Sequence, residues 1–188
     1  TPSQGTVQVQ VTAGPYQKSS LEGRLTLAPE QRLTLTRLRL QHQAFTWENV
    51  GTLTVVRSPQ GRLDLQRFAL RNGRQEISAR GILIPEGGMT ADLHIQHVQI
   101  LPYMRLLAPE TGLVAGEATL HLSLHGTLAH PQGEGGLHLT SLRWQQHDLG
   151  EVHGQVQMRG TAVGVDLRWR DRKQELLHLS GEAHLGTR

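Results

Sequence analysis

The sequence has few aromatic residues and no cysteine, and both shortages restrict what the chain can be. Its 188 residues include three Trp, two Tyr and two Phe, so aromatic residues make up 4% of the chain. Without Cys there is no disulfide, no thiolate metal site and no cysteine nucleophile. The sequence also lacks a run of about 18 apolar residues, which excludes a membrane-spanning helix.

Basic residues are in slight excess, but they form no cluster. The formal net charge is +3 with His neutral. Lysine occurs only at Lys18 and Lys173, and the arginines are scattered from Arg24 to Arg188. A nucleic-acid-binding protein more often carries a basic block with aromatic residues between the charges. We therefore expect no nucleic-acid partner.

Apolar and polar residues alternate along nearly the whole chain. Val7, Val9 and Val11, for example, are separated by Gln8 and Gln10. A period of two is typical of strands with one apolar and one hydrated face, and hence of an antiparallel sheet.

The alternation changes phase at two places. One change falls near Thr36-Arg37, and the other separates Leu65 from Phe68. An extra residue or a bend in a strand produces such a change, so the first shift predicts a β-bulge or a bend near Thr36-Arg37.

Turn signals and recurring glycines complete the prediction of the fold. Asn72-Gly73 is a strong hairpin signal, and a Gly followed by alternating Leu or Val recurs from Gly23 to Gly154, which favours a curled sheet. The apolar–polar alternation is interrupted once, where apolar residues at helical spacing predict a short helix near 100–108. We expect an all-β fold, a long antiparallel sheet curled into an open trough. Residues 1–188 would form a single segment, with a possible sub-boundary at the helical break, 97–112.

The inner face of such a sheet consists mainly of Leu and Val. A thick sandwich core usually contains larger side chains, whereas an open aliphatic trough requires an apolar occupant. Acyl chains meet this requirement because they are flexible, aliphatic and need no hydrogen bonds. The residues expected to line the trough are Leu25, Leu27, Leu33, Leu35, Leu53, Val55, Leu63, Leu65, Leu93, Ile95, Leu120, Leu122, Leu124, Leu137, Leu139, Val156, Met158, Val165, Leu167, Leu177 and Leu179.

Three segments resemble the repeats of a known family. Leu124–Leu139, with the sequence LHGTLAHPQGEGGLHL, is similar to the recurring G-T-L-x-x-P-x-x-x-G-x-L-x-L unit of the TamB family. Leu149–Val156 is similar to its L-G-x-V-x-G-x-V element, and Asn72–Gly81 to a strand-turn-strand unit that ends in Gly. AsmA-like proteins share this style of repeat.

The resemblance implies a function that the alternation alone does not. TamB-family proteins are very long, are anchored in the inner membrane by one helix and extend through the periplasm of diderm bacteria. Their folded β-sheet carries a hydrophobic groove implicated in moving phospholipids between membranes, and an outer-membrane barrel protein of the BamA superfamily is a partner. Since the sequence begins with Thr1 and shows no anchor, we expect a central or late groove segment, with the barrel protein bound by other parts of the full-length chain.

The eleven histidines and the acidic residues form no recognisable catalytic or metal motif. His121 and His125 lie four residues apart in an expected strand, hence about 13 Å apart, too far to share an ion. His94 and His97 would point to opposite faces of a regular strand, whereas cross-strand meetings of His138 with His121 or His125 stay open. We expect no enzyme activity, no cofactor and no metal.

Two other readings remain open. One is a structural or chaperone-like scaffold that offers sheet edges to the strands of outer-membrane proteins by β-augmentation. The other is a closed β-sandwich or barrel, packed by Leu, that serves as a binding module.

Overall fold

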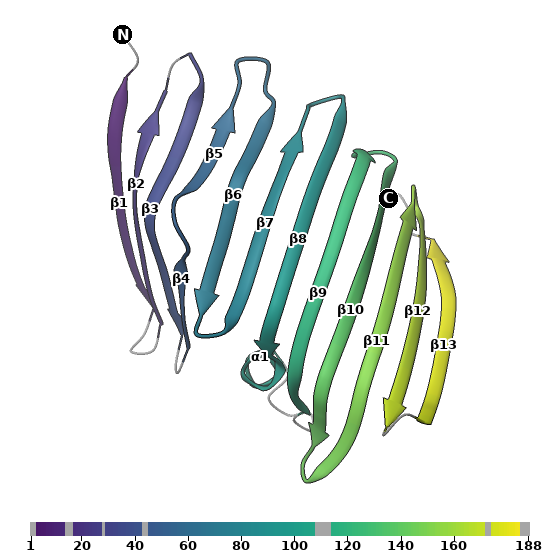
Figure 1. Ribbon diagram of the computed structural model, residues 1–188. Coiled ribbons are helices and arrows are strands. Elements are labelled where there is room, and N and C mark those ends of the chain that lie inside the picture. Colours follow the sequence, from purple (N-terminus) through teal and green to yellow (C-terminus); the bar gives the residue numbers. More distant parts are fainter. Residues whose placement is uncertain are drawn as a thin grey trace. The chain divides into compact units, whose positions relative to one another are not determined.

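The computed structural model describes residues 3–13, 17–27, 29–42, 45–107, 114–171 and 174–184. They form a 13-stranded antiparallel sheet and one helix, which confirms the predicted all-β class (Figure 1). Helix α1 spans Ile100–Leu107, while residue 108, the predicted end, lies outside the described residues. The strands are β1 (Gln4–Ala13), β2 (Gln17–Thr26), β3 (Gln31–His42), β4 (Phe45–Asn49), β5 (Leu53–Arg57), β6 (Leu63–Asn72), β7 (Gln75–Leu83), β8 (Gly88–Gln99), β9 (Val114–Thr127), β10 (Pro131–Trp144), β11 (His147–Arg159), β12 (Ala162–Asp171) and β13 (Gln174–His184).

The hydrogen-bonded order of the strands follows the chain. Neighbours run β1-β2-β3-β4-β6-β7-β8-β9-β10-β11-β12-β13, and β5 pairs with β3 and β6. The chain divides into two compact units, Thr1–Asp92 and Leu93–Arg188. The division falls inside β8, whereas the sequence placed a possible sub-boundary at 97–112.

In the first unit, both predicted phase changes are sites where one strand holds an extra residue. Glu22 pairs with Arg37 and Gly23 with Leu35, so that Thr36 is the extra residue in β3. Similarly, Leu65 pairs with Gly81 and Phe68 with Ala79. Each bulge returns the following apolar residues to the face occupied by those before it.

Asn49 holds the bulged part of β3. β4 pairs with the end of β3 and β5 with its beginning. Residues 36–38 of β3 lie between these two parts, and neither β4 nor β5 pairs with them. The Asn49 Oδ1 atom accepts a 2.7 Å hydrogen bond from the Leu38 N–H, and its Nδ2 donates a 3.1 Å bond to the Thr36 carbonyl. One side chain thus satisfies two backbone groups that the irregular pairing leaves without a strand partner.

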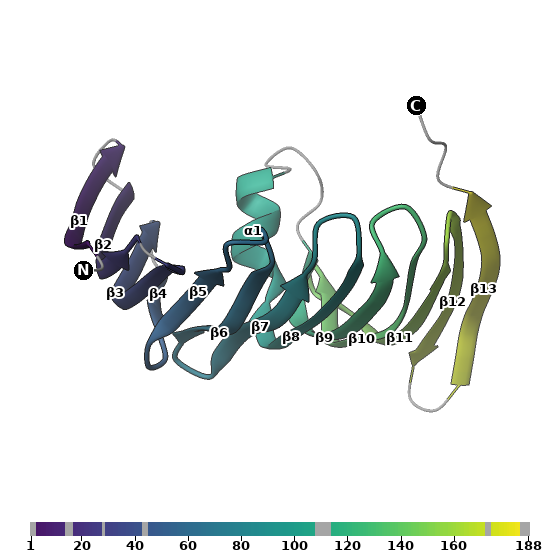
Figure 2. The same cartoon turned by 90° about the horizontal axis from the view of Figure 1, so that it is seen from above.

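The second unit contains a five-strand meander, β9 to β13, in which every strand pairs with its sequence neighbour. The strands curve along their length rather than lying flat (Figure 2). Buried apolar residues are few in both units. Those of the described part are Leu35, Trp47, Leu53, Val56, Ala69 and Leu70 in the first unit, and Val98 and Leu142 in the second.

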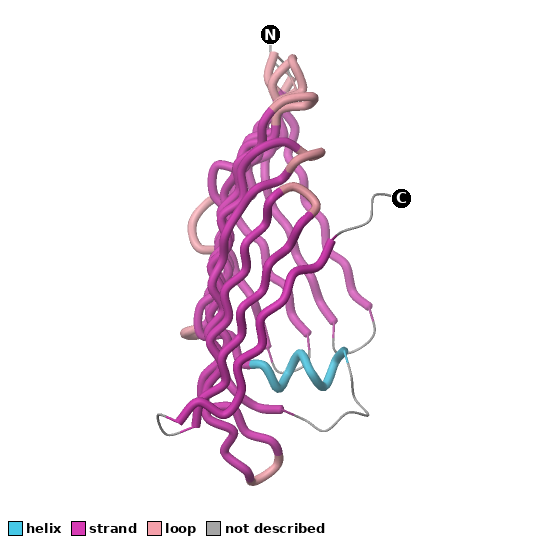
Figure 3. Tube along the Cα trace, turned by 90° about the vertical axis from the view of Figure 1, so that its right-hand side faces the viewer, coloured by secondary structure: helices cyan, strands magenta, loops and turns pink. Residues whose placement is uncertain are grey.

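Helix α1 packs against one end of β9. It projects from one side of the strands (Figure 3). A Cβ atom added to Gly116 would lie 3.4 Å from Ile100 Cδ1 and 2.8 Å from Leu142 Cδ2. Because Gly116, Ile100 and the buried Leu142 meet there, the helix covers the end of the sheet face that carries the alternating Leu and Val.

His94 and His97 point to the same face, whereas a regular strand would place them on opposite faces. His94 contacts His121 with ring centroids 5.4 Å apart, and His97 Nδ1 lies 2.6 Å from Glu117 Oε1. His121 and Glu117 are an even number of residues apart on β9, so both contacts lie on one face. The strand is irregular at His97, where φ is 55°, and this places the following Val98 on the apolar face.

Candidate functional site: an uninterrupted apolar sheet face

In the second unit, apolar residues pair directly across the five strands of the meander. Their register forms four rows along the sheet, and no polar side chain enters any of them. The rows are Leu120–Leu137–Gly154–Leu167–Leu179, Leu122–Gly135–Val156–Val165–Gly181, Leu124–Gly133–Met158–Val163–Ala183 and Ala118–Leu139–Val152–Trp169–Leu177.

The first unit builds a face of the same kind from shorter rows. Leu25 pairs with Leu33, which pairs with Val55, which in turn pairs with Leu65. A second row contains Gly23, Leu35 and Leu53. The bulges of β3 and β6 maintain this face, because they bring the apolar residues that follow them back into phase.

The pairing brings the residues proposed from the sequence together within each unit. Leu63 lies opposite Leu83, and Leu27 follows the end of β2, where its N–H bonds the Ser3 carbonyl. Leu93 and Ile95 flank His94, whose ring meets His121 on the polar face, so that these two residues point to the apolar face. The other proposed residues lie in the rows given above.

Glycines within the rows make room for the leucines beside them. A Cβ on Gly154 would lie 2.8 Å from Leu167 Cδ2 and 3.3 Å from Leu137 Cβ. At Gly133 it would lie 2.7 Å from Leu124 Cδ2, and at Gly135 3.1 Å from Leu122 Cδ1. The Leu side chains therefore lie over the neighbouring strand, which gives the face a cover of branched aliphatic groups.

This face is incompletely covered by the protein itself. None of the described side chains is fully buried, and none of the described polar or charged residues is buried. Leu177 and Leu179 remain 53% and 57% exposed.

The opposite face carries the charges. Asp166 accepts hydrogen bonds from His178, at 2.7 Å from Nε2, and from Arg168, at 3.1 Å from Nε. The bond from His178, together with the charge of Arg168, lowers the pKa of the Asp166 carboxyl below its usual 3.8. Hydrogen bonds from His153 and His138 likewise lower the pKa of Glu151. Since successive residues of a strand alternate, these groups lie on the far side from Leu167 and Val152.

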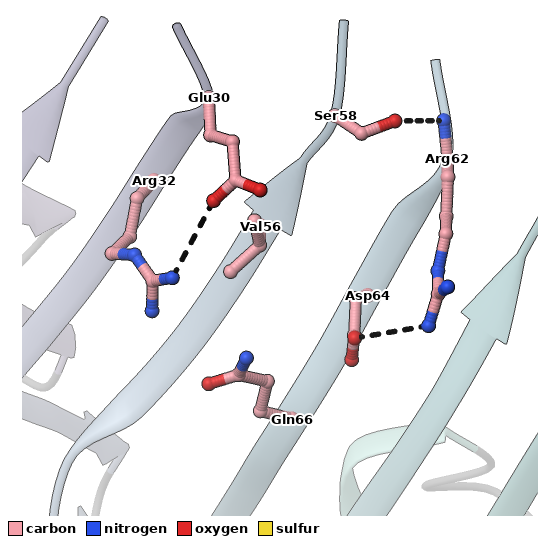
Figure 4. Close-up of a pocket in the computed structure, with 7 residues that line it drawn as sticks. All are labelled: Glu30, Arg32, Val56, Ser58, Arg62, Asp64 and Gln66. Carbon is pink, nitrogen blue, oxygen red and sulfur yellow. Dashed lines mark hydrogen bonds and ion pairs between the residues drawn. The ribbon is translucent and has the colours of Figure 1, made fainter. Parts of the chain in front are cut away.

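A polar hollow of about 270 Å³ lies on the first unit, lined by Val56 and six polar residues (Figure 4). Its charges pair with one another: Arg32 lies 3.7 Å from Glu30, and Arg62 3.5 Å from Asp64. Ser58 Oγ accepts a 3.2 Å bond from the Arg62 N–H. The hollow is therefore an ion-paired part of the polar surface rather than a site with a charge left to bind a ligand.

Sequence reasoning missed some residues of the apolar face and left the cross-strand partner of His138 open. Leu142 and Val152 belong to the apolar face; the shift of phase from Leu139 to Leu142 was the signal that could have found the first. His138 lies opposite Thr119 on β9 and His153 on β11, rather than opposite His121 or His125. Both histidines contact Glu151, so the structure assembles a group of three potential metal ligands that the sequence did not indicate.

The fold and the site define an all-β protein with an antiparallel sheet, in whose second unit four apolar rows cross β9 to β13. Comparison with known proteins adds no relative, since no family model, no curated protein and no solved structure matches the chain. Among the described residues, no helix has the length and apolar character needed to cross a membrane.

Proposed function

We propose that the chain is a segment of a hydrophobic groove that holds and passes phospholipid acyl chains. The observation that carries this proposal is the set of four apolar rows on β9 to β13, which no charged or amide side chain interrupts. The occupant of such a face must be apolar over several strands and must need no hydrogen bond, because the face offers no polar side chain.

The exposure of the face supports an occupant that is not part of the described chain. Apolar patches larger than a few hundred Å² are rare on proteins without a partner, yet Leu177 and Leu179 are about half exposed. Leu and Val side chains present flexible, aliphatic groups, which match an acyl chain better than they match a planar or polar ligand.

The similarity of the three sequence segments to TamB-family repeats suggests the wider setting. In this proposal the full-length protein is anchored in the inner membrane and spans the periplasm of a diderm bacterium. It would move phospholipid between the inner and outer membranes in connection with outer-membrane assembly and protein translocation. An outer-membrane barrel protein of the BamA superfamily would bind other parts of the full-length chain, and this segment would act without enzymatic chemistry.

Lipid extraction tests the proposal. The 188-residue chain is purified from bacterial cells without detergent, extracted with organic solvent and analysed by mass spectrometry. We expect phospholipid in the wild-type extract and at least several-fold less from a Leu177→Asp, Leu179→Asp variant. The matched control is Leu128→Asp, because Leu128 is 68% exposed but lies outside the strands. A folded wild-type chain without bound lipid that also fails to take up a fluorescent fatty acid would overturn the proposal.

The two outer strands of the sheet favour a second candidate, a scaffold for β-augmentation. Among the described strands, β1 and β13 each pair with one neighbour, and every residue of β13 is exposed. An edge strand of this kind offers its backbone N–H and C=O groups to an added strand. Leu177→Pro and His178→Pro each remove one backbone N–H from β13. Because the N–H groups of successive residues alternate in direction, one variant loses an N–H that points toward β12 and the other an N–H that points away from the sheet. The scaffold is favoured if the proline variant that stays folded no longer binds an added strand but still binds lipid.

A further inference from the structure

Three potential metal ligands converge on the polar face of the hairpin formed by β10 and β11. Glu151 lies 3.2 Å from His153 Nε2 through Oε1 and 3.4 Å from His138 Nε2 through Oε2. The ligand atoms of the three residues all lie within 4.8 Å of one another. Among the residues that the structure describes, this is the one such group of three.

The register of the hairpin explains the convergence. His138 on β10 pairs directly with His153 on β11, and their rings stack with centroids 4.0 Å apart and planes 23° apart. Glu151 precedes His153 by two residues and therefore points to the same face. The two-residue turn at Gln145–Gln146 fixes this pairing, since Trp144 and His147 are the last partners before it.

The two arginines next to His138, Glu151 and His153 pair with other acidic residues and so do not occupy these three ligands. On β12, Arg168 lies opposite His153, and Arg170 lies opposite Glu151. Arg168 donates to Asp166, and Arg170 lies 3.9 Å from Glu175, so each guanidinium has an acidic partner of its own. The side chains of His138, Glu151 and His153 are between 41% and 43% exposed, so an ion can reach them from solvent.

We propose that His138, Glu151 and His153 bind one divalent transition-metal ion. The two Nε2 atoms and the Glu151 carboxylate supply three ligands, and water completes a tetrahedral site. Imidazole and carboxylate are ligands that suit zinc. Ligand atoms about 2.0–2.2 Å from a tetrahedral ion lie about 3.4 Å from one another. Oε1 of Glu151 lies 3.2 Å from His153 Nε2 and Oε2 lies 3.4 Å from His138 Nε2, so a rotation of the stacked imidazole rings brings both nitrogens to one ion beside the carboxylate.

Binding replaces the hydrogen bonds of Glu151 by bonds to the ion. The ion would link β10 to β11 on the face opposite the apolar rows. The site is independent of the proposed lipid function, because none of its residues belongs to the apolar face.

Zinc titration tests the site. The 188-residue chain competes with a chromophoric zinc chelator, and wild type is compared with His138→Ala, Glu151→Gln and His153→Ala. We expect one tight zinc ion per wild-type chain, and each variant should bind that ion at least about tenfold more weakly. His121→Ala is the matched control: it removes one ring of the His94–His121 pair, which belongs to no group of three ligands in the described residues.

Two further measurements separate this site from chance binding by the other histidines. Cobalt bound in place of zinc should give the intense visible absorption of a four-coordinate site in wild type and lose it in Glu151→Gln. Zinc should raise the Tm of wild type but not of His138→Ala. Circular dichroism confirms that each variant is folded. Equal zinc affinity in wild type and in a variant lacking all three ligands would overturn the proposal.

Discussion

The Leu167 side chain on β12 lies over Gly154 on β11, so closely that a Cβ on Gly154 would come within 2.8 Å of Leu167 Cδ2. The same relationship recurs at Gly133 and Gly135, which lie beneath Leu124 and Leu122. A glycine within a row thus provides space for the leucine of the next strand, and the sheet gains an aliphatic surface without a second layer of side chains.

Alanine at a covered glycine should destabilise the fold. In Gly133→Ala the new Cβ would overlap the Ser123 carbonyl oxygen and lie 2.7 Å from Leu124 Cδ2, so we expect a loss of about 1–3 kcal/mol. Gly181 has no atom within 4 Å of the added Cβ, and Gly181→Ala should be neutral or up to about 1 kcal/mol stabilising. Urea unfolding measures both. Equal free energies of unfolding for the two variants would contradict the account.

Asn49 should be one of the most sensitive polar residues of the first unit. Asn49→Ala leaves the Leu38 N–H and the Thr36 carbonyl without their side-chain partner, so we expect about 1–3 kcal/mol of destabilisation in urea unfolding. Asn49→Asp keeps an acceptor for Leu38 and loses the donated bonds, so its stability should lie between those of wild type and the alanine variant. Wild-type stability in Asn49→Ala would show that water replaces both bonds.

Asp166 should make stability depend on pH in the acid range. Because its bonds from His178 and Arg168 lower its pKa below the usual 3.8, the folded state favours the carboxylate. The stabilisation is present at pH values above the unfolded pKa and is lost as pH falls through the lower pKa of the folded state. Wild type should therefore exceed Asp166→Asn in stability at pH 6, and the difference should shrink below pH about 3.8.

The titration of Asp166 can be followed directly. The carboxyl carbon, observed by NMR, should titrate with a midpoint below the usual value in wild type. His178→Ala removes the largest cause of the lowered pKa, so its midpoint should rise. A midpoint that does not move in His178→Ala would mean that another group holds the carboxylate.

A charge on the exposed part of the apolar face should reduce lipid binding without unfolding the chain. Leu179 is 57% exposed in β13, so Leu179→Asp should change the free energy of unfolding by no more than about 0.5 kcal/mol. Its affinity for a fluorescent fatty acid should fall several-fold, because the carboxylate requires water where an acyl chain would lie. Leu128→Asp is the control, and an equal loss of binding there would point to a general charge effect.

Much of the fold could be predicted because the alternation of Leu and Val records it directly. The changes of phase marked the bulges at Thr36 and between Leu65 and Phe68, since an extra residue must shift the pattern. The irregularity at His97 also shifts the apolar pattern, from Ile95 to Val98. The expectation for His94 and His97 assumes a regular strand and therefore does not use this shift.

Contacts that depend on exact pairing were harder to predict. His138 meets His153 only because the hairpin turns at Gln145–Gln146, and glutamine is not a residue type that marks a turn. Gln145 adopts a φ of 58° there. The role of Asn49 was hidden for a similar reason: the interruption between β4 and β5 that it bridges changes no apolar alternation.

Photocrosslinking from neighbouring residues tests the central claim most directly, because successive residues of one strand point to opposite faces. Benzoylphenylalanine is placed at Leu122 or Val156 on the apolar face, and at His121 or Gln155 beside them on the polar face. The chain is irradiated with vesicles of radiolabelled phospholipid. The account predicts strong labelling at Leu122 and Val156 and little at their neighbours. Equal labelling of the two faces, or stronger labelling at His121 and Gln155, would contradict a lipid-holding apolar face.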